Sequence, residues 1–238
     1  MHPANCARGQ SLSRKGGRPT RPPRRDRLHH VNLTATDCTL WLIRHGETTW
    51  NLEGRIQGQS ESPLSELGRR QARELGARLA ATRFDRVLSS DLGRAVETAR
   101  LAFPGREPEL EPRLRERSAG SLEGRRVSEL TPAELEGLRG LTAARAGGGP
   151  AGAEPYPDLL ERARAWLAGL RGDGVVACVT HGGFIQAVLR LAFGQTDPAG
   201  WPTAPRVMIA NTSITELRFV AGRAVVARVN DHAHLEGV

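Results

Sequence analysis

Long apolar runs and cysteines are scarce in this chain of 238 residues. No segment approaches the roughly 20 consecutive apolar residues that a membrane-spanning helix needs. The three cysteines, Cys6, Cys38 and Cys178, are far apart and form no Cys-x-x-Cys pair, which excludes a cysteine-based zinc site and suits a reducing compartment. The composition, with 39% apolar and 25% charged residues, is that of an ordinary globular protein. We therefore expect a cytoplasmic protein with no membrane partner.

Acidic residues are nearly missing from the first 35 positions, which carry most of the net charge of +8. Residues 1–35 contain eight Lys or Arg and a single acid, Asp26, so the remainder is close to neutral and does not indicate nucleic-acid binding. This segment is rich in Arg, Gly, Pro and Ser, and we expect a disordered basic N-terminal extension. It lacks the apolar run of a secretory signal. A non-functional extension or misplaced start, an electrostatic arm and an organelle transit peptide all stay open.

Short apolar runs from residue 39 onward predict the strands. Continuous runs at 39–43 and 175–179, with a shorter one at 86–88, are typical of strands buried on both faces of a parallel sheet. Near the end of the chain, residues 213–230 predict two strands joined by a tight turn at Ala221-Gly222.

Segments of helical periodicity lie between these strands, and TPAE at 131–134 has the Thr, Pro and Glu of a strong helix start. The predicted helices cover 64–79, 92–102, 159–170 and 183–192. Strands that alternate with helices predict an α/β fold, a three-layer α/β/α sandwich with a mostly parallel central sheet. In such folds a ligand binds at the carboxyl ends of the strands.

Unusual polar residues follow three of the predicted strands. Arg44-His45-Gly46 ends the first, Ser89-Ser90-Asp91 ends the second with Arg94 in the helix that follows, and His181-Gly182-Gly183 ends the third. Arginines and helix N-termini bind anions, and the guanidinium fork matches phosphate oxygens. Taken singly, each could be a structural histidine, a solvated charge or a turn glycine. Their repetition at three strand ends favours a phosphate pocket.

Five segments in order resemble the signature of the histidine phosphatase superfamily. They are LIRHGETTWN, SPLSELGRRQA, SSDLGRAVETA, LRERSAGSLEG and VTHGGFIQAVL, and the similarity runs from about Thr39 to the end of the chain. The resemblance is to the phosphoglycerate mutase-like branch, marked by the Arg-His-Gly motif. It implies a phosphoglycerate mutase-like domain over 36–238, with a small helical cap over about 117–157.

The resemblance implies a role for each matching residue. His45 resembles the nucleophile that becomes phosphohistidine, Arg44 and Arg94 the arginines that clamp the phosphoryl group, and His181 the second histidine that donates to its oxygens. Glu116 falls where this branch has its proton donor. Glu47 is expected to support the loop after the Arg-His-Gly motif. Further substrate-binding positions are implied at Asn51, Gln57, Gly58 and Gly182. We expect no cofactor and no metal, since no acid cluster has the spacing of Mg²⁺ ligands.

Two departures favour a phosphatase over a mutase. The stretch from Gly124 to Tyr156 spans 33 residues and has no lysine, whereas the mutases carry a long insertion with lysine and tyrosine there. His181 is followed by Gly-Gly where the mutases have Gly-Asn. The short cap resembles the broad-specificity and α-ribazole phosphatase subgroups, although Ala153-Glu154-Pro155 replaces their usual Gly-Glu-Ser.

The preferred hypothesis is therefore a metal-independent phosphomonoesterase that acts on a small phosphorylated metabolite. A cofactor-dependent phosphoglycerate mutase and a non-catalytic phosphate-binding module are the alternatives, and a homodimer is possible. The four arginines in and near the cap either favour small anionic substrates or are simply solvated. They are Arg125, Arg126, Arg139 and Arg145.

Overall fold

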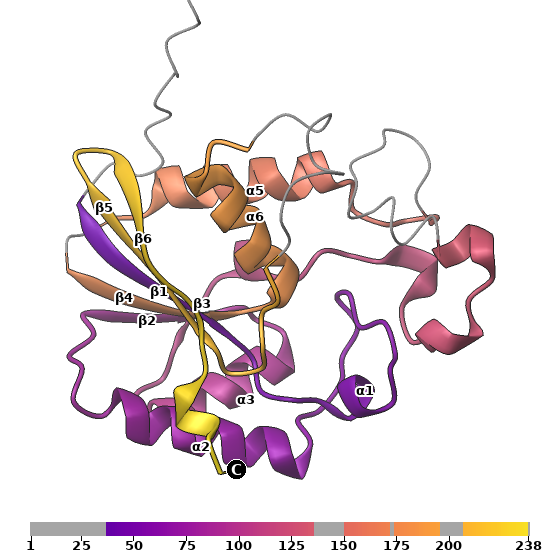
Figure 1. The fold of residues 1–238 in the computed structure, drawn as a ribbon, viewed down its shortest axis with the longest axis horizontal. Helices are drawn as coiled ribbons and strands as arrows, with labels where there is room; N and C mark the ends of the chain where they lie inside the picture. Colours follow the sequence, from indigo (N-terminus) through magenta and orange to yellow (C-terminus); the bar gives the residue numbers. More distant parts are fainter. Residues whose placement is uncertain (1–36, 136–149, 172–173, 196–206, 238) are drawn as a thin grey trace, which may run out of the picture.

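A computed structural model describes residues 37–135, 150–171, 174–195 and 207–237 of the chain. These residues form a six-stranded sheet in the order β3-β2-β4-β1-β5-β6 (Figure 1). The strands are β1 (Cys38–Arg44), β2 (Arg86–Ser89), β3 (Glu109–Leu110), β4 (Val175–Thr180), β5 (Ile214–Val220) and β6 (Arg223–Asp231).

The sheet is parallel over four strands and antiparallel at one side. Strands β3, β2, β4 and β1 are parallel, while β5 runs antiparallel to β1 and β6 antiparallel to β5. The hairpin between β5 and β6 turns at Ala221-Gly222, where both residues have positive φ, as the sequence predicts. The two-residue strand β3 is the one addition to the predicted strands, and it is too short to give an apolar run.

Helices cover both faces of the sheet, which confirms the three-layer sandwich (Figure 1). Side chains of α2 and α3 pack on one face, together with Ile43 and Val179 of the sheet. Side chains of α5 and α6 pack on the other face, together with Leu42 and Cys178. The helices are α1 (Thr49–Leu52), α2 (Glu66–Leu79), α3 (Gly93–Ala102), α5 (Tyr156–Gly169) and α6 (Gly182–Ala192), and short 3₁₀ helices span Pro112–Leu114, Gly120–Leu122, Val127–Glu129 and Ala233–Leu235.

The predicted helix bounds agree with these to within three residues. Helix α5 begins at Tyr156, three residues before the predicted start, because Pro157 lies within its first turn and suits that position. The helix start at Thr131 is also found, with the backbone N–H of Thr131 donating to the Glu134 carboxylate at 2.8 Å. The rest of that helix and the predicted disordered extension lie outside the described residues.

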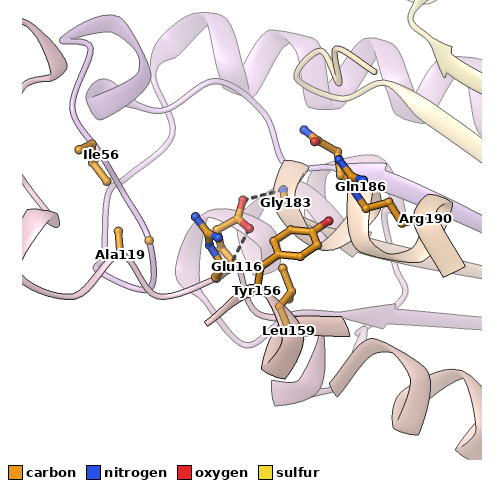
Figure 2. A pocket seen from close by; sticks show the side chains of 10 residues that line it. Ile56, Glu116, Ala119, Tyr156, Leu159, Gly183, Gln186 and Arg190 are labelled. Atoms are coloured by element: carbon orange, nitrogen blue, oxygen red, sulfur yellow. Dashed lines mark hydrogen bonds between the residues drawn. The ribbon is translucent and has the colours of Figure 1, made fainter. Parts of the chain in front are cut away.

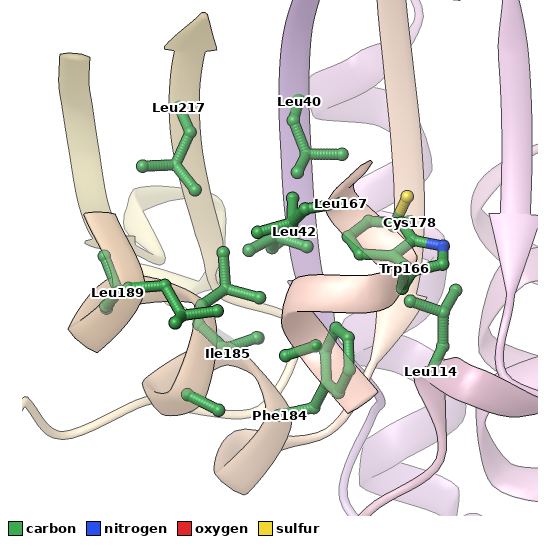
Figure 3. Close-up of a cluster of buried hydrophobic side chains, with 14 of the residues drawn as sticks. Leu40, Leu42, Leu114, Trp166, Leu167, Cys178, Phe184, Ile185, Leu189 and Leu217 are labelled. Atoms are coloured by element: carbon green, nitrogen blue, oxygen red, sulfur yellow. The ribbon is translucent and has the colours of Figure 1, made fainter. Parts of the chain in front are cut away.

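The larger apolar cluster fixes α6 against the end of β4 (Figure 3). Trp166 of α5 and Phe184 of α6 are fully buried and meet edge to face, with ring centroids 5.6 Å apart. Full burial of an aromatic or aliphatic side chain stabilises the fold by about 1.5–3 kcal/mol. Because Phe184 is three residues after His181, this packing also fixes the polar end of β4.

Close backbone approach fixes the loop after β1. A Cβ added to Gly46 would lie 2.6 Å from the carbonyl oxygen of Gly68, and one added to Gly68 would collide with the backbone of Glu47. Ser65, the N-cap of α2, accepts a hydrogen bond from the Gly68 N–H and donates one at 2.7 Å to the Glu47 carboxylate. Glu47 thus supports the loop through the N-terminus of α2.

Gly68→Ala should destabilise the protein, although alanine is the better helix former by about 1 kcal/mol. We expect a loss of about 1–3 kcal/mol in the free energy of unfolding, measured by urea denaturation, because the new methyl group overlaps the Glu47 backbone. Gly169→Ala in α5 is the control, since its methyl group would meet only the Arg113 side chain, at 3.4 Å. Equal effects of the two substitutions would contradict the proposed packing.

Candidate active site

Two histidines meet at the carboxyl edge of the sheet. His45 follows β1 and His181 follows the adjacent strand β4, and their ring centroids are 5.1 Å apart. The Nδ1 atom of His45 lies 2.7 Å from the Gly46 carbonyl oxygen, which can only accept a hydrogen bond. Nδ1 therefore carries the proton, and Nε2 holds the lone pair. In His181 the Nε2 atom contacts the Ser90 hydroxyl at 2.9 Å, whereas Nδ1 is buried with no hydrogen-bond partner.

Burial and nearby cations keep both imidazoles neutral. His45 is 3% exposed and His181 is fully buried. Burial, Arg94 and Arg44 together hold the pKa of His45 well below its usual range. Burial, Arg94 and the neighbouring His45 do the same for the pKa of His181. A neutral imidazole can act as a nucleophile or donate a single hydrogen bond, so both rings are in a form suited to phosphoryl chemistry.

Two guanidinium groups lie beside these rings, and backbone carbonyls hold both of them. Arg94 is 1% exposed and donates to the carbonyl oxygens of Ser60 and Gly58 at 2.8 and 2.7 Å. Arg44 is partly buried and donates to the Ile209 carbonyl oxygen at 2.5 Å.

These two cations have no ion-pair partner among the described residues. Neither Arg44 nor Arg94 forms an ion pair within the part of the chain that the structure describes, and the Nε atom of each is buried without a partner. Burial lowers the pKa of both guanidinium groups, and nearby Glu116 partly opposes this. Two desolvated cations with buried unpaired donors constitute an anion site.

Glu116 lies at the N-terminus of α6. Its Oε2 atom accepts a hydrogen bond from the Gly183 N–H at 3.0 Å, and its Oε1 atom accepts one from the Arg117 N–H at 2.9 Å (Figure 2). A Cβ on residue 183 would collide with the Glu116 carboxylate, so a side chain at this position would force the acid to move. The second glycine after His181 thus makes room for the acid.

The other predicted substrate-binding residues lie around this cluster. The Gly58 carbonyl oxygen holds Arg94, and Gly182 begins α6 beside the Arg44 guanidinium. The Gln57 Oε1 atom is buried without a partner. The Asn51 side chain is engaged locally, because its Oδ1 atom accepts from the Thr48 N–H in the capping box of α1.

Glu123 is a positioning residue that the sequence analysis did not single out. Its carboxylate accepts hydrogen bonds from the Gln59 N–H at 3.0 Å, the Ser60 hydroxyl at 2.5 Å and the Ala119 N–H at 2.9 Å. Burial raises the pKa of Glu123, but these hydrogen bonds outweigh it and leave the pKa below its usual value. Glu123 thus fixes the loop whose carbonyl groups hold Arg94. The sequence does contain a signal for this residue, because Glu123 is the acid of the Leu-Glu-Gly that ends the fourth motif, LRERSAGSLEG.

A half-buried ion pair fixes the segment that carries Glu116. Arg162 of α5 pairs with Glu154 at 2.7 Å and donates to the Arg115 carbonyl oxygen at 2.8 Å. Glu154 belongs to the segment Ala153-Glu154-Pro155, which replaces the expected Gly-Glu-Ser. Although its flanking residues differ, the segment retains the glutamate that pairs with Arg162.

The cap arginines that the structure describes are paired with acids. Arg125 pairs with Glu134, and Arg126 pairs with Glu53 at 3.3 Å. These pairs favour the interpretation of Arg125 and Arg126 as structural surface charges. Arg139 and Arg145 lie outside the described residues.

A mostly parallel sheet that carries two neutral histidines and two unpaired arginines at one edge defines an α/β protein with a buried anion site. The chain belongs to the histidine phosphatase superfamily, because the sequence pattern of its branch 1 matches residues 40–232. A probable phosphoglycerate mutase of Yersinia enterocolitica is 32% identical over 207 residues, covering 83% of this chain and 94% of its own.

Solved structures of two other proteins share the fold. YhfR of Bacillus stearothermophilus has a TM-score of 0.71 and 32% identity, and the alignment covers 83% of this chain and 98% of YhfR. A phosphoserine phosphatase variant of Entamoeba histolytica, solved with phosphoserine, has a TM-score of 0.70 and 27% identity, with 83% and 99% covered.

Neither a metal cluster nor a membrane span is found among the residues described. No three His, Cys, Asp or Glu side chains in the described ranges gather as metal ligands would. No helix within those same ranges is long and apolar enough to cross a membrane.

The two buried histidines should make the protein less stable as the pH falls below about 6.5. The unfolded chain takes up protons there with ordinary histidine pKa values, whereas the folded protein does not. Each histidine should cost about 1.4 kcal/mol between pH 7.5 and 5.5, measured by urea denaturation. The variant His181→Asn should show a smaller pH dependence by that amount. An unchanged dependence would contradict the neutral, buried state of His181.

Proposed function

We propose that this protein is a metal-independent phosphomonoesterase that hydrolyses small phosphorylated metabolites through a phosphohistidine intermediate on His45. The observation that carries the proposal is the pair of arginines, each with a buried unpaired Nε atom and no ion pair among the described residues, beside a neutral imidazole whose Nε2 atom is unprotonated. A phosphoryl group supplies the missing negative charge and is the natural target of that lone pair.

In the first step, His45 Nε2 attacks phosphorus as the ester oxygen departs. Arg44, Arg94 and the Nδ1–H of His181 stabilise the charge on the phosphoryl oxygens, which is the main catalytic requirement of phosphoryl transfer. Protonated Glu116 donates its proton to the departing alkoxide. In the second step, the Glu116 carboxylate takes a proton from water, the resulting hydroxide attacks phosphorus, and the N–P bond breaks to release phosphate and restore His45.

A phosphoglycerate mutase is the second candidate, because the Yersinia relative is named a probable phosphoglycerate mutase. Gly183, where the mutases carry asparagine, favours the phosphatase, and in this chain the Glu116 carboxylate fills the space next to it. The phosphoserine phosphatase among the structural relatives also supports hydrolysis. The cytoplasmic location, the cap boundaries and a homodimer remain predictions from the sequence.

Phosphate release from a panel of phosphomonoesters, with chelator and without added metal, tests the proposal. We expect turnover by the wild-type protein and a loss of at least 10³-fold in His45→Ala, because a missing nucleophile is rarely compensated. His232→Ala, at an exposed histidine, is the control and should keep full activity. Hydrolysis by His45→Ala near the wild-type rate would refute the mechanism. Interconversion of 3- and 2-phosphoglycerate with little free phosphate would identify a mutase instead.

Gly183→Ala tests the role of Glu116. The added methyl group displaces the carboxylate, so hydrolysis of alkyl phosphates, whose leaving oxygen needs a proton, should fall by about 10- to 100-fold. Hydrolysis of p-nitrophenyl phosphate should fall much less, because its phenolate leaves without protonation. Equal losses for both substrates would show that Glu116 is not the proton donor.

A further inference from the structure

The loop before β5, residues 209–213, lies against the main chain of His45. The Thr212 N–H donates to the carbonyl oxygens of Arg44 and His45, at 3.0 and 3.3 Å. The side-chain amide of Asn211 donates to the same His45 carbonyl oxygen at 3.0 Å. These hydrogen bonds fix the main chain at the end of β1 relative to the loop.

The imidazole of His45 follows this main chain. Its Nδ1 atom is bound to the Gly46 carbonyl oxygen at 2.7 Å, so the ring is tied to the backbone next to it. A displacement of the backbone therefore moves the Nε2 atom as well. Attack on phosphorus tolerates little displacement, since a misplacement of about 1 Å can cost about 100-fold in rate.

Thr212 makes its contacts in a conformation that threonine rarely adopts. Its φ is 55°, in the left-handed region, where a β-branched residue is strained, and its side chain is fully buried. Such a conformation persists only where the surrounding structure imposes it, and strain of this kind is concentrated at functional sites. Relaxation of Thr212 to a negative φ would redirect the chain and weaken the hydrogen bonds to the end of β1.

The side chain of His234 binds the Thr212 hydroxyl. Its Nε2 atom lies 3.1 Å from that oxygen, and its Nδ1 atom is buried without a partner among the described residues. His234 belongs to the 3₁₀ helix Ala233–Leu235, which packs against α2 (Figure 1). Asp231, the last residue of β6, also pairs with Arg78 of α2 at 3.5 Å. The hydrogen bond to Thr212 thus connects the loop to a segment that is seated on α2.

We propose that His234 is a positioning residue for phosphoryl transfer: it holds Thr212 in the strained conformation that binds the main chain of His45. The inference rests on the proposed function, in which the Nε2 atom of His45 attacks phosphorus. Because His234 contacts Thr212 and Thr212 contacts His45, the effect on the rate passes through the backbone. Arg94 is held by carbonyl groups of a separate loop. Loss of His234 should therefore lower kcat more than it weakens phosphate binding.

The variant His234→Phe, which keeps a ring and removes the hydrogen bond, tests this role. We expect kcat for p-nitrophenyl phosphate to fall by about 10- to 100-fold, while the dissociation constant of inorganic phosphate, measured by calorimetry, changes less than about 3-fold. His234→Gln, whose amide can bind the Thr212 hydroxyl, should retain most of kcat. Arg78→Gln is the matched control, because it removes another contact with α2 and should leave kcat unchanged. An unchanged kcat in His234→Phe, or equal losses in His234→Phe and Arg78→Gln, would overturn the inference.

A second substitution tests the route through Thr212. Glycine adopts a positive φ without strain, so adding Thr212→Gly to the His234→Phe protein should raise kcat by about 3-fold or more. The double variant should nevertheless be less stable to urea, because it has lost a buried side chain. A purely structural role for His234 predicts instead that activity falls further together with stability, and that result would overturn the inference.

Hydrogen exchange keeps this inference separate from the proposed function. In His234→Phe the Thr212 amide, followed by NMR, should exchange about 10-fold faster or more than in the wild-type protein, whereas Arg78→Gln should leave its exchange unchanged. Unchanged exchange of this amide in His234→Phe would overturn the inference even if the protein hydrolyses phosphate esters. Faster exchange, together with no hydrolysis by the wild-type protein, would support the hold of His234 on Thr212 and refute the phosphatase.

Discussion

The constraint on which this structure depends is the burial of two guanidinium groups that form no ion pair with a carboxylate of the described residues. Removing a cation from water is costly unless hydrogen bonds and an opposite charge compensate. Arg94 receives part of this compensation from the carbonyl groups of Ser60 and Gly58, and Arg44 from that of Ile209. The Nε atom of each stays unpaired. The folded protein therefore holds two incompletely compensated cations, and the surrounding structure has to prevent their side chains from turning out to solvent.

That surrounding structure consists of backbone carbonyls, the half-buried acid Glu123 and a packed core. Glu123 binds the loop that includes Ser60, so the acid stabilises Arg94 from a distance without neutralising the phosphoryl site. The edge-to-face contact of Trp166 with Phe184 fixes α6, and with it His181 and the N–H of Gly183. Gly46 and Gly68 allow the loop that carries His45 to approach α2. Stability and site geometry thus depend on the same contacts, and loosening any of them would leave buried charge unsupported.

The sequence predicted the parts of this arrangement that have a local signal. Apolar runs in the sequence correctly predicted β1, β2 and β4. The polar residues that follow these three strands include His45, Arg94 and His181. Strand β3 was missed because two exposed residues cannot form a periodic pattern.

Arg117 could not be recognised in the same way. It lies in a segment rich in arginine, and only its burial beside Tyr156 separates it from the paired arginines around it. The pairing of Arg125 with Glu134 also depends on a contact that spacing alone does not predict. Charge in a sequence says how many cations are present, and packing decides which of them lack a partner.

Glu116 depends on the main chain for its position. The backbone N–H groups of Gly183 and Arg117 donate hydrogen bonds to its two carboxylate oxygens, at 3.0 and 2.9 Å. Gly183 belongs to α6, which the contact of Trp166 with Phe184 holds in place. Because main-chain groups rather than side chains hold this acid, a substitution in a neighbouring side chain, such as that of residue 117, can alter the surrounding charge while Glu116 stays in place.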